Sequence, residues 1–318
     1  MTVGDLPFMN RFATLLLAAV LSTILVSSAS QRAFAHTFQG GDTAEFLTMV
    51  EIIKSETSLA AGNLSDKDVA KDHVEHATDA LTNSTIKEIA EKNERLSKDL
   101  PASLESLAKA VDSGASVSEV NQNVKALGDL LDETVSVRIE KAQLTNSTVR
   151  AVIVSNLVNE ALEHYGEAIG FEGNMTDMSH LQMSNSSNSG EQMSNSSGMS
   201  MSSSNTKIVS VANYQSAQAF AKRAQDLYTQ IKPQAISGTE TATKSLDSAF
   251  PEFIQAIDNK ASAQDLMNIG HIKIHPSLMM AYNLQVVPEF PLPLLILLPV
   301  LAAIVMIGRF RLLPGSPR

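Results

Sequence analysis

Residues 101–120 read PASLESLAKAVDSGASVSEV, and residues 247–266 read DSAFPEFIQAIDNKASAQDL. The second stretch repeats the pattern of the first 146 positions later: Leu104, Leu107, Ala110, Val111, Asp112, Ala115, Ser116 and Val120 correspond to Phe250, Phe253, Ala256, Ile257, Asp258, Ala261, Ser262 and Leu266. Apolar residues spaced three and four apart are typical of a helix with one buried face. Because such helices cannot bury those faces singly, we expect two tandem helical bundles that arose by duplication.

Upstream of these stretches the copies match at other offsets. The offset is 147 for Ala77-x-Asp79 against Ala224-x-Asp226, and 108 for Ala60-Ala61-Gly62 against Ala168-Ile169-Gly170. The second copy therefore carries 147 − 108 = 39 extra residues between its first two helices. We assign the first copy to residues 36–145 and the second to residues 146–284, with a Met/Ser/Asn-rich insertion, expected to be disordered, at residues 171–206.

Helix-start and helix-stop residues bound several of the predicted helices. Asp42 can cap a helix that ends at Gly62, Ser116-Val-Ser-Glu119 forms a capping box, and another helix covers Thr148 to Ile169. Pro101 stands where a helix can start. Since the sequence nowhere alternates with period two for long enough to form a strand, the predicted fold class is all-α.

Composition narrows the range of functions. The 318 residues carry a formal net charge of −10, which disfavours nucleic acid as a partner. The absence of cysteine excludes disulfides, thiolate metal sites and cysteine nucleophiles. Because the sequence also lacks a nucleophile elbow, a phosphate loop and a dinucleotide fingerprint, we do not expect an enzyme; a hydrolase remains the third alternative.

The first 35 residues are typical of a signal peptide. Arg11 precedes an apolar core from Phe12 to Val26, and Ala33-Phe34-Ala35 forms a small-x-small cleavage site for signal peptidase. An uncleaved N-terminal anchor is the alternative. Cleavage would leave His36 at the N-terminus, where its amine and imidazole can bind copper if a second histidine completes the site.

The C-terminal segment, residues 285–318, contains a second apolar run. Pro288-Glu289-Phe290 precedes an uncharged stretch that ends at Gly308, and Arg309 and Arg311 follow. As a helix, this stretch would be roughly 28 Å long, about one bilayer core. Basic flanks stay in the cytoplasm, so residues 36–288 are expected outside the cell, anchored in its membrane.

This ending resembles the PEF-CTERM sorting signal of archaeal surface proteins, in which a Pro-Glu-Phe motif, an apolar helix and a basic tail follow one another. The resemblance covers about the last thirty residues. It implies that an archaeosortase-type enzyme cuts near the motif Pro288, Glu289, Phe290 and anchors the protein. The alternative is a plain tail anchor without processing.

A second resemblance lies in the second copy. Tyr165-Gly-Glu-Ala168-Ile169-Gly170 is followed by Tyr214 and by a helix through Ala221, Ala224 and Leu227. This pattern is similar to the helical extracytoplasmic domain found ahead of some oxidase-coupled iron permeases. The permease's own glutamate-rich membrane motif is absent here. The resemblance implies a metal-related accessory role outside the membrane.

The insertion holds the residues that we consider first as metal ligands: Met175, Met178, His180, Met183, Met193, Met199 and Met201. Thioethers are soft ligands that favour Cu(I), and a flexible segment without a core to fill has no packing need for methionine. We therefore predict copper binding there, with a plain spacer as the alternative.

Histidine pairs form a weaker set of candidates. His73 and His76 stand one helical turn apart, as do His271 and His275, so either pair can hold zinc or copper with a third ligand from another helix. The alternative is that these are surface histidines. A further run, formed by Glu160, Glu163, His164 and Glu167, is interpreted as a solvated acidic face because the chain lacks the Glu-x-x-His motif of di-iron bundles.

Sequons begin at Asn63, Asn83 and Asn146, between predicted helices, and an exported chain can carry glycans there. The sequence thus predicts a membrane-anchored extracytoplasmic helical protein that binds or handles a metal ion, copper being favoured. The alternative is a structural or interaction glycoprotein of the cell envelope that binds no metal.

Overall fold

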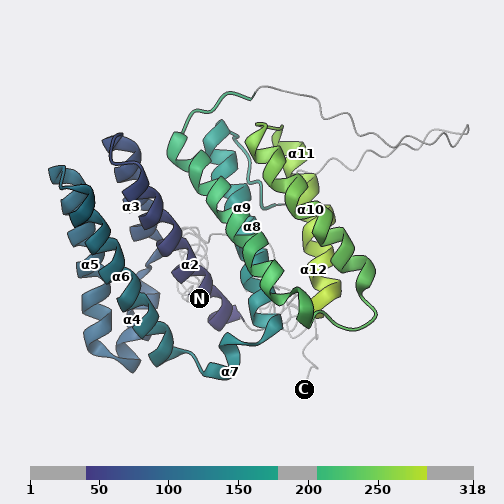
Figure 1. Ribbon diagram of the computed structural model, residues 1–318, viewed down its shortest axis with the longest axis horizontal. Coiled ribbons are helices and arrows are strands. Elements are labelled where there is room, and N and C mark those ends of the chain that lie inside the picture. Colours follow the sequence, from purple (N-terminus) through teal and green to yellow (C-terminus); the bar gives the residue numbers. More distant parts are fainter. Residues whose placement is uncertain (1–40, 178–205, 285–318) are drawn as a thin grey trace, which may run out of the picture. The chain divides into compact units, whose positions relative to one another are not determined.

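The computed structural model describes residues 41–177 and 206–284, and within these ranges every regular element is a helix (Figure 1). The predicted all-α fold class is confirmed for this part of the chain. No helix in it is long and apolar enough to span a membrane. The signal-like start, residues 178–205 of the insertion and the C-terminal segment with Pro288, Glu289 and Phe290 lie outside the described residues.

The first half, defined as residues 41–144, contains six helices: α2 (Gly41–Gly62), α3 (Lys67–Ala80), α4 (Asn83–Lys92), α5 (Glu94–Ser113), α6 (Val117–Arg138) and the short α7 (Lys141–Leu144). Asn93 caps α5, and Ser116 caps α6 by accepting a hydrogen bond from the Glu119 amide at 3.2 Å, as the capping box predicted. The apolar faces of α2 to α6 meet in one core that includes Ile53, Leu100 and Leu127.

The second half, defined as residues 147–284, contains α8 (Ser147–Ile169), α9 (Val211–Ile231), the 3₁₀ turn η2 (Lys232–Gln234), α10 (Glu240–Asp258), α11 (Ala263–Asn268), the π-helical η3 (Ile269–Ile274) and α12 (His275–Tyr282). The core of the second half contains more aromatic side chains than that of the first, and among them Tyr165, Phe220 and Phe250 are fully buried. Each half therefore closes around its own apolar cluster, although Ala44 and Ile52 of α2 pack into the core of the second half.

The repeated motif adopts the same local geometry in both halves. After α5, Gly114 takes a left-handed conformation (φ 69°), and after α10 its counterpart Lys260 does so too (φ 53°). The next residue donates its amide to the carbonyl five positions earlier at 2.9 Å in both halves, from Ala115 to Ala110 and from Ala261 to Ala256. Ser116 and its counterpart Ser262 then cap the following helices. The sequence match at offset 146 thus corresponds to a match in backbone conformation.

Pro101 does not start a helix, so that expectation is wrong. It lies inside α5, which begins at Glu94, and Pro251 likewise lies inside α10. Proline in a helix interior removes one backbone hydrogen bond. Here the helix continues because its apolar face, with Leu100 and Leu104 almost fully buried, is held by the core on both sides of the proline.

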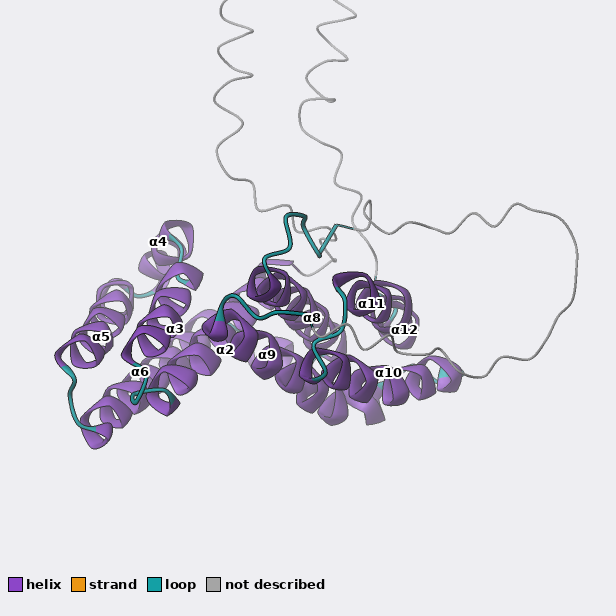
Figure 2. Cartoon of the chain, turned by 90° about the horizontal axis from the view of Figure 1, so that it is seen from above, coloured by secondary structure: helices purple, strands orange, loops and turns teal. Residues whose placement is uncertain are grey.

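The two halves meet through the first two helices of each. In both views the pair α2–α3 lies beside the pair α8–α9, with α5 and α6 on one side and α10 and α12 on the other (Figures 1 and 2). Arg223 of α9 donates two hydrogen bonds to the carboxylate of Glu51 on α2, at 2.7 and 2.9 Å. We call this contact region, formed by α2, α3, α8 and α9, the joint.

Candidate metal site

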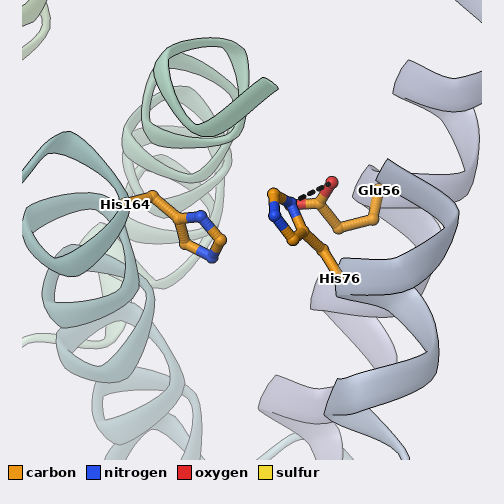
Figure 3. Close-up of side chains that lie close together, drawn as sticks. All are labelled: Glu56, His76 and His164. Carbon is orange, nitrogen blue, oxygen red and sulfur yellow. Dashed lines mark ion pairs between the residues drawn. The ribbon is translucent and has the colours of Figure 1, made fainter. Parts of the chain in front are cut away.

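Three side chains that can ligate a metal ion converge at the joint. Glu56 comes from α2, His76 from α3 and His164 from α8, and one potential ligand atom of each lies within 4.8 Å of those of the other two. Glu56 is fully buried, whereas the two histidines are half-buried. Figure 3 shows His164 facing the pair of Glu56 and His76 from the opposite helix.

The register of α2 and α8 brings Glu56 and His164 together. The two positions differ by 108, the offset at which the first helices of the two copies match, so they are equivalent positions of the repeat. Thr48 and Asn156 also differ by 108, and the Asn156 amide donates to the Thr48 hydroxyl at 3.2 Å. Because equivalent residues meet at two levels eight residues apart, α2 and α8 run parallel and in register.

Glu56 is held in place by a fully buried histidine. Its Oε2 atom lies 2.7 Å from Nδ1 of His73, and neither side chain is exposed to solvent. The same Oε2 lies 3.6 Å from Nδ1 of His76, which is an ion-pair distance and too long for a hydrogen bond. Within the described residues, Oε1 of Glu56 and Nδ1 of His76 are buried and have no hydrogen-bond partner.

Two side-chain amides determine that Nε2 of His73, the ring nitrogen that does not contact Glu56, carries a proton. The Asn63 amide donates to the Leu59 carbonyl at 2.8 Å, so its Oδ1 is the atom that accepts from Gln215 Nε2 at 3.1 Å. Gln215 therefore turns its Oε1 towards His73 Nε2, 2.8 Å away. Because an amide oxygen only accepts, His73 must carry a proton on Nε2.

The proton between His73 and Glu56 belongs on the histidine. Burial alone raises the pKa of Glu56, but contacts with His73, His76 and Ser216 outweigh it and lower this pKa to about 2. Glu56 is therefore a carboxylate at neutral pH, and His73 donates to it from Nδ1. The pair is a buried imidazolium and carboxylate.

The pKa values of the two half-buried histidines shift in opposite directions. Burial lowers the pKa of His164. Its Nδ1 lies 2.7 Å from Asn213 Oδ1 and donates to it, which leaves a lone pair on Nε2. Burial also acts on His76, but the neighbouring Glu56 carboxylate outweighs it and raises the pKa of His76. The neutral form that binds a metal ion is therefore favoured by the surroundings of His164 and disfavoured by those of His76.

The arrangement fits a metal centre because of its ligand atoms and because of the hydrogen bonds that orient the ligand side chains. Two imidazoles and one carboxylate are a common ligand set for zinc and other divalent transition metals, with further positions left for water or substrate. Metal-bound histidines and carboxylates usually have a second hydrogen-bond partner that orients them. Asn213 supplies that partner for His164, and His73 supplies it for Glu56.

The sequence predicted part of this site. It singled out His76 and His73, and the structure places both at the joint, although His73 is fully buried and is not a surface residue. It missed Glu56. It also assigned His164 to a solvated face, which is wrong for this residue because His164 is half-buried against His76 and Phe220, with ring centroids 4.9 and 5.3 Å apart.

His271 and His275 lie elsewhere, in the core of the second half. Both are buried, their ring centroids are 5.2 Å apart, and Nε2 of His271 lies 2.8 Å from the carbonyl oxygen of Met175. Neither joins a group of three or more His, Asp or Glu ligands in the described part of the chain. His271 therefore contacts the start of the insertion, and His275 lies beside His271 in the core.

Met175 is a core residue, with 1% of its surface exposed. Its side chain covers Gly166, where a Cβ would lie 3.1 Å from the sulfur. The expectation that methionines of the insertion have no core to fill is thus wrong for Met175. The remaining candidates lie outside the described residues: His36, Met178, His180, Met183, Met193, Met199 and Met201.

The three sequons occupy different surroundings. Asn83, the first residue of α4, and Asn146, the N-cap of α8, are exposed. Asn63 is half-buried, and both ends of its amide are hydrogen-bonded in the chain that reaches His73. Asn83 and Asn146 are the more accessible of the three.

No protein-family model, no curated protein and no solved structure matches this chain.

Proposed function

We propose that this protein binds one divalent transition-metal ion, Cu(II) or Zn(II), between Glu56, His76 and His164. The observation that carries the proposal is the convergence of three ligands from three helices, with Glu56 Oε1 and His76 Nδ1 buried and without a hydrogen-bond partner within the described residues. Buried polar atoms are rarely left without a partner. A bound cation would satisfy both atoms at once.

The donor set selects the class of ion. Imidazole suits Zn(II) and Cu(II), whereas Mg²⁺ and Ca²⁺ prefer oxygen ligands. Cu(I) prefers thioethers, and the group formed by Glu56, His76 and His164 offers none. Cu(I) binding by the methionines of the insertion remains a separate part of the proposal, for Met178 and the later donors.

The setting of the site comes from the sequence. A signal peptide over residues 1–35 and an anchor after Phe290 would hold the ectodomain outside the cell, so the protein would meet metal ions there. In this proposal the protein handles the ion as an accessory and is not an enzyme. The chain reaching from Asn63 through Gln215 to His73 favours a second candidate, a purely structural envelope protein whose polar network links its halves.

We also infer that the two halves descend from one duplicated bundle. Support comes from the repeated helix end at Gly114 and Lys260, from the matching caps at Ser116 and Ser262, and from the meeting of equivalent positions on α2 and α8. In a fused duplicate the equivalent helices α2 and α8 lie side by side. One pair of equivalent positions, Glu56 and His164, can then supply a ligand from each half.

Titration calorimetry of the full chain in detergent tests the metal site. Zn(II) and Cu(II) should each bind with a stoichiometry of one at the joint. His76→Gln and His164→Gln should each lower the affinity for Zn(II) by about tenfold or more, because each removes one of three ligands. Both variants keep the Glu56–His73 pair.

Deletion of residues 178–205 is the matched control. It should leave Zn(II) binding unchanged and remove Cu(I) binding if the insertion holds Cu(I). If the double variant His76→Gln/His164→Gln binds Zn(II) and Cu(II) as tightly as the native chain, or if the native chain binds neither, the metal proposal is wrong and the structural candidate stands.

A further inference from the structure

We infer that the ion held by Glu56, His76 and His164 locks the joint, so that metal occupancy sets how firmly the two halves are held together. This inference rests on the metal site proposed above. It assigns that site a consequence for the rest of the molecule: occupied, the joint is closed, and empty, the halves can move against each other.

The ligands come from both sides of the joint. Glu56 and His76 belong to the first half, and His164 belongs to the second half. Each half has its own apolar cluster, although Ala44 and Ile52 of α2 belong to the cluster of the second half. An ion that coordinates all three side chains therefore adds a cross-link between the two halves.

The other contacts across the joint are both polar and apolar. Arg223 and Glu51 form an ion pair whose side chains are 34% and 21% exposed, Asn156 donates to Thr48, and His73 donates to Gln215. Solvent screens the partly exposed ion pair. From the first half, Ala44 and Ile52 belong to the core of the second half, and Leu47 and Ala80 pack against it. Parts of a chain that meet through such a mixed interface can move relative to each other.

Binding requires the joint to tighten. Zinc holds nitrogen and oxygen ligands at about 2.0–2.2 Å, which in tetrahedral geometry separates two ligand atoms by roughly 3.4 Å. Nδ1 of His76 lies 3.6 Å from Oε2 of Glu56, the oxygen that contacts His73, and the ligand atoms of the group of three lie within 4.8 Å of one another. These atoms must therefore approach one another, which draws His164 of the second half towards Glu56 and His76 of the first.

A ligand that binds only the closed arrangement shifts the population towards it. The shift grows with the ratio of ion concentration to dissociation constant. Metal should thus act on α2, α3, α8 and α9 as a unit, whereas α5 and α10, which lie away from the joint, should not respond.

Hydrogen exchange read by mass spectrometry on the full chain, with and without Zn(II), tests the lock. We expect amides of α2, α3, α8 and α9 to exchange at least several-fold more slowly with zinc, and those of α5 and α10 to remain unchanged. Calorimetry on the same sample records binding separately, so failure to bind refutes the proposed site, whereas binding without protection of the joint refutes only the lock.

A control variant should bind zinc within the first half alone. Asp72→His combined with His164→Gln places two histidines one turn apart on α3, beside Glu56, and removes the ligand of the second half. It should bind zinc without protecting α8 and α9. Equal protection in this variant would refute the lock, and if it fails to bind, the native comparison still decides.

A distance measurement gives an independent answer. The chain has no cysteine, so Lys98→Cys on α5 and Lys244→Cys on α10, both exposed, accept one spin label each. Zinc should narrow the distribution of distances between the labels. An unchanged distribution in a sample that binds zinc would overturn the inference.

Discussion

At the scale of single residues, the proposed site involves two pairs of positions that the sequence repeat aligns and that carry different residues in the two halves. In the first half, Glu56 on α2 contacts His73 on α3. The equivalent residues in the second half are His164 and Phe220, whose ring centroids lie 5.3 Å apart. The first half thus holds a buried ion pair, and the second half holds an imidazole against an aromatic ring. Because the halves differ, the joint carries a carboxylate from one side and an imidazole from the other.

The buried pair predicts a large effect for His73→Phe, the residue that the second half has at this place. The substitution leaves the Glu56 carboxylate buried without its imidazolium, and removing one partner of a buried pair typically costs about 3–5 kcal/mol. Denaturant unfolding of the metal-free protein measures the loss. Adding Glu56→His, which copies the pair of His164 and Phe220, should restore much of the stability. A single variant within about 1 kcal/mol of the native chain would contradict this account.

At the scale of helices, residue patterns within one turn are enough to predict most helix boundaries, but they do not predict the proposed metal site. The capping box at Ser116 and the left-handed stop at Gly170 act within one turn, so the sequence predicts them directly. No residue pattern around Glu56 in α2 distinguishes it as a candidate ligand. His164 lies among Glu160, Glu163 and Glu167, which favoured a solvated face.

The offset of 108 aligned Glu56 with His164, yet an alignment of copies does not say that equivalent positions touch. That contact depends on α2 and α8 packing parallel and in register, which only the tertiary structure shows. The buried state of Met175 has the same origin, since the space over Gly166 is created by the fold.

The repeated helix end yields a reciprocal prediction. Lys260 takes the left-handed conformation that its counterpart Gly114 takes freely, and for a residue with a side chain this costs roughly 1–2 kcal/mol. Lys260→Gly should therefore raise the free energy of unfolding by about 0.5–1 kcal/mol after the entropy of the unfolded chain is counted.

Gly114→Ala should lower the free energy of unfolding by about 1 kcal/mol, because alanine at this position must take the left-handed conformation. The cost is in the backbone alone, since nothing lies within 4 Å of the added Cβ. Thermal unfolding of the two variants against the native chain measures both changes. A lower midpoint for Lys260→Gly would show that the lysine side chain contributes more than its backbone strain costs.

At the scale of the whole molecule, the halves differ in which residues fill their cores. All four tyrosines, Tyr165, Tyr214, Tyr228 and Tyr282, belong to the second half, and the chain has no tryptophan. Tyr165 donates to the Ala261 carbonyl at 2.6 Å, and Tyr228 donates to the Thr243 carbonyl at 3.0 Å. Tyrosine absorbance therefore reports on the second half alone, whereas circular dichroism reports on the helices of both.

This division makes alkaline titration informative. Burial raises the pKa of all four tyrosines, and for Tyr282 the value rises to about 12. In the unfolded chain they ionise near pH 10. The folded state thus binds more protons above about pH 10, so the tyrosine contribution to stability is complete below that pH and is lost as the pH rises towards 12 and beyond.

We therefore expect the tyrosinate absorbance of the native protein to rise only well above pH 10, together with loss of helix in the second half. Chain unfolded in denaturant should titrate near pH 10 and serves as the control. Native tyrosines that ionise at the same pH as the unfolded chain, with the helix content unchanged, would contradict their burial. The first half contains no tyrosine. If helix content falls at a lower pH than the one at which the tyrosinate absorbance rises, residues 41–144 are the less stable half.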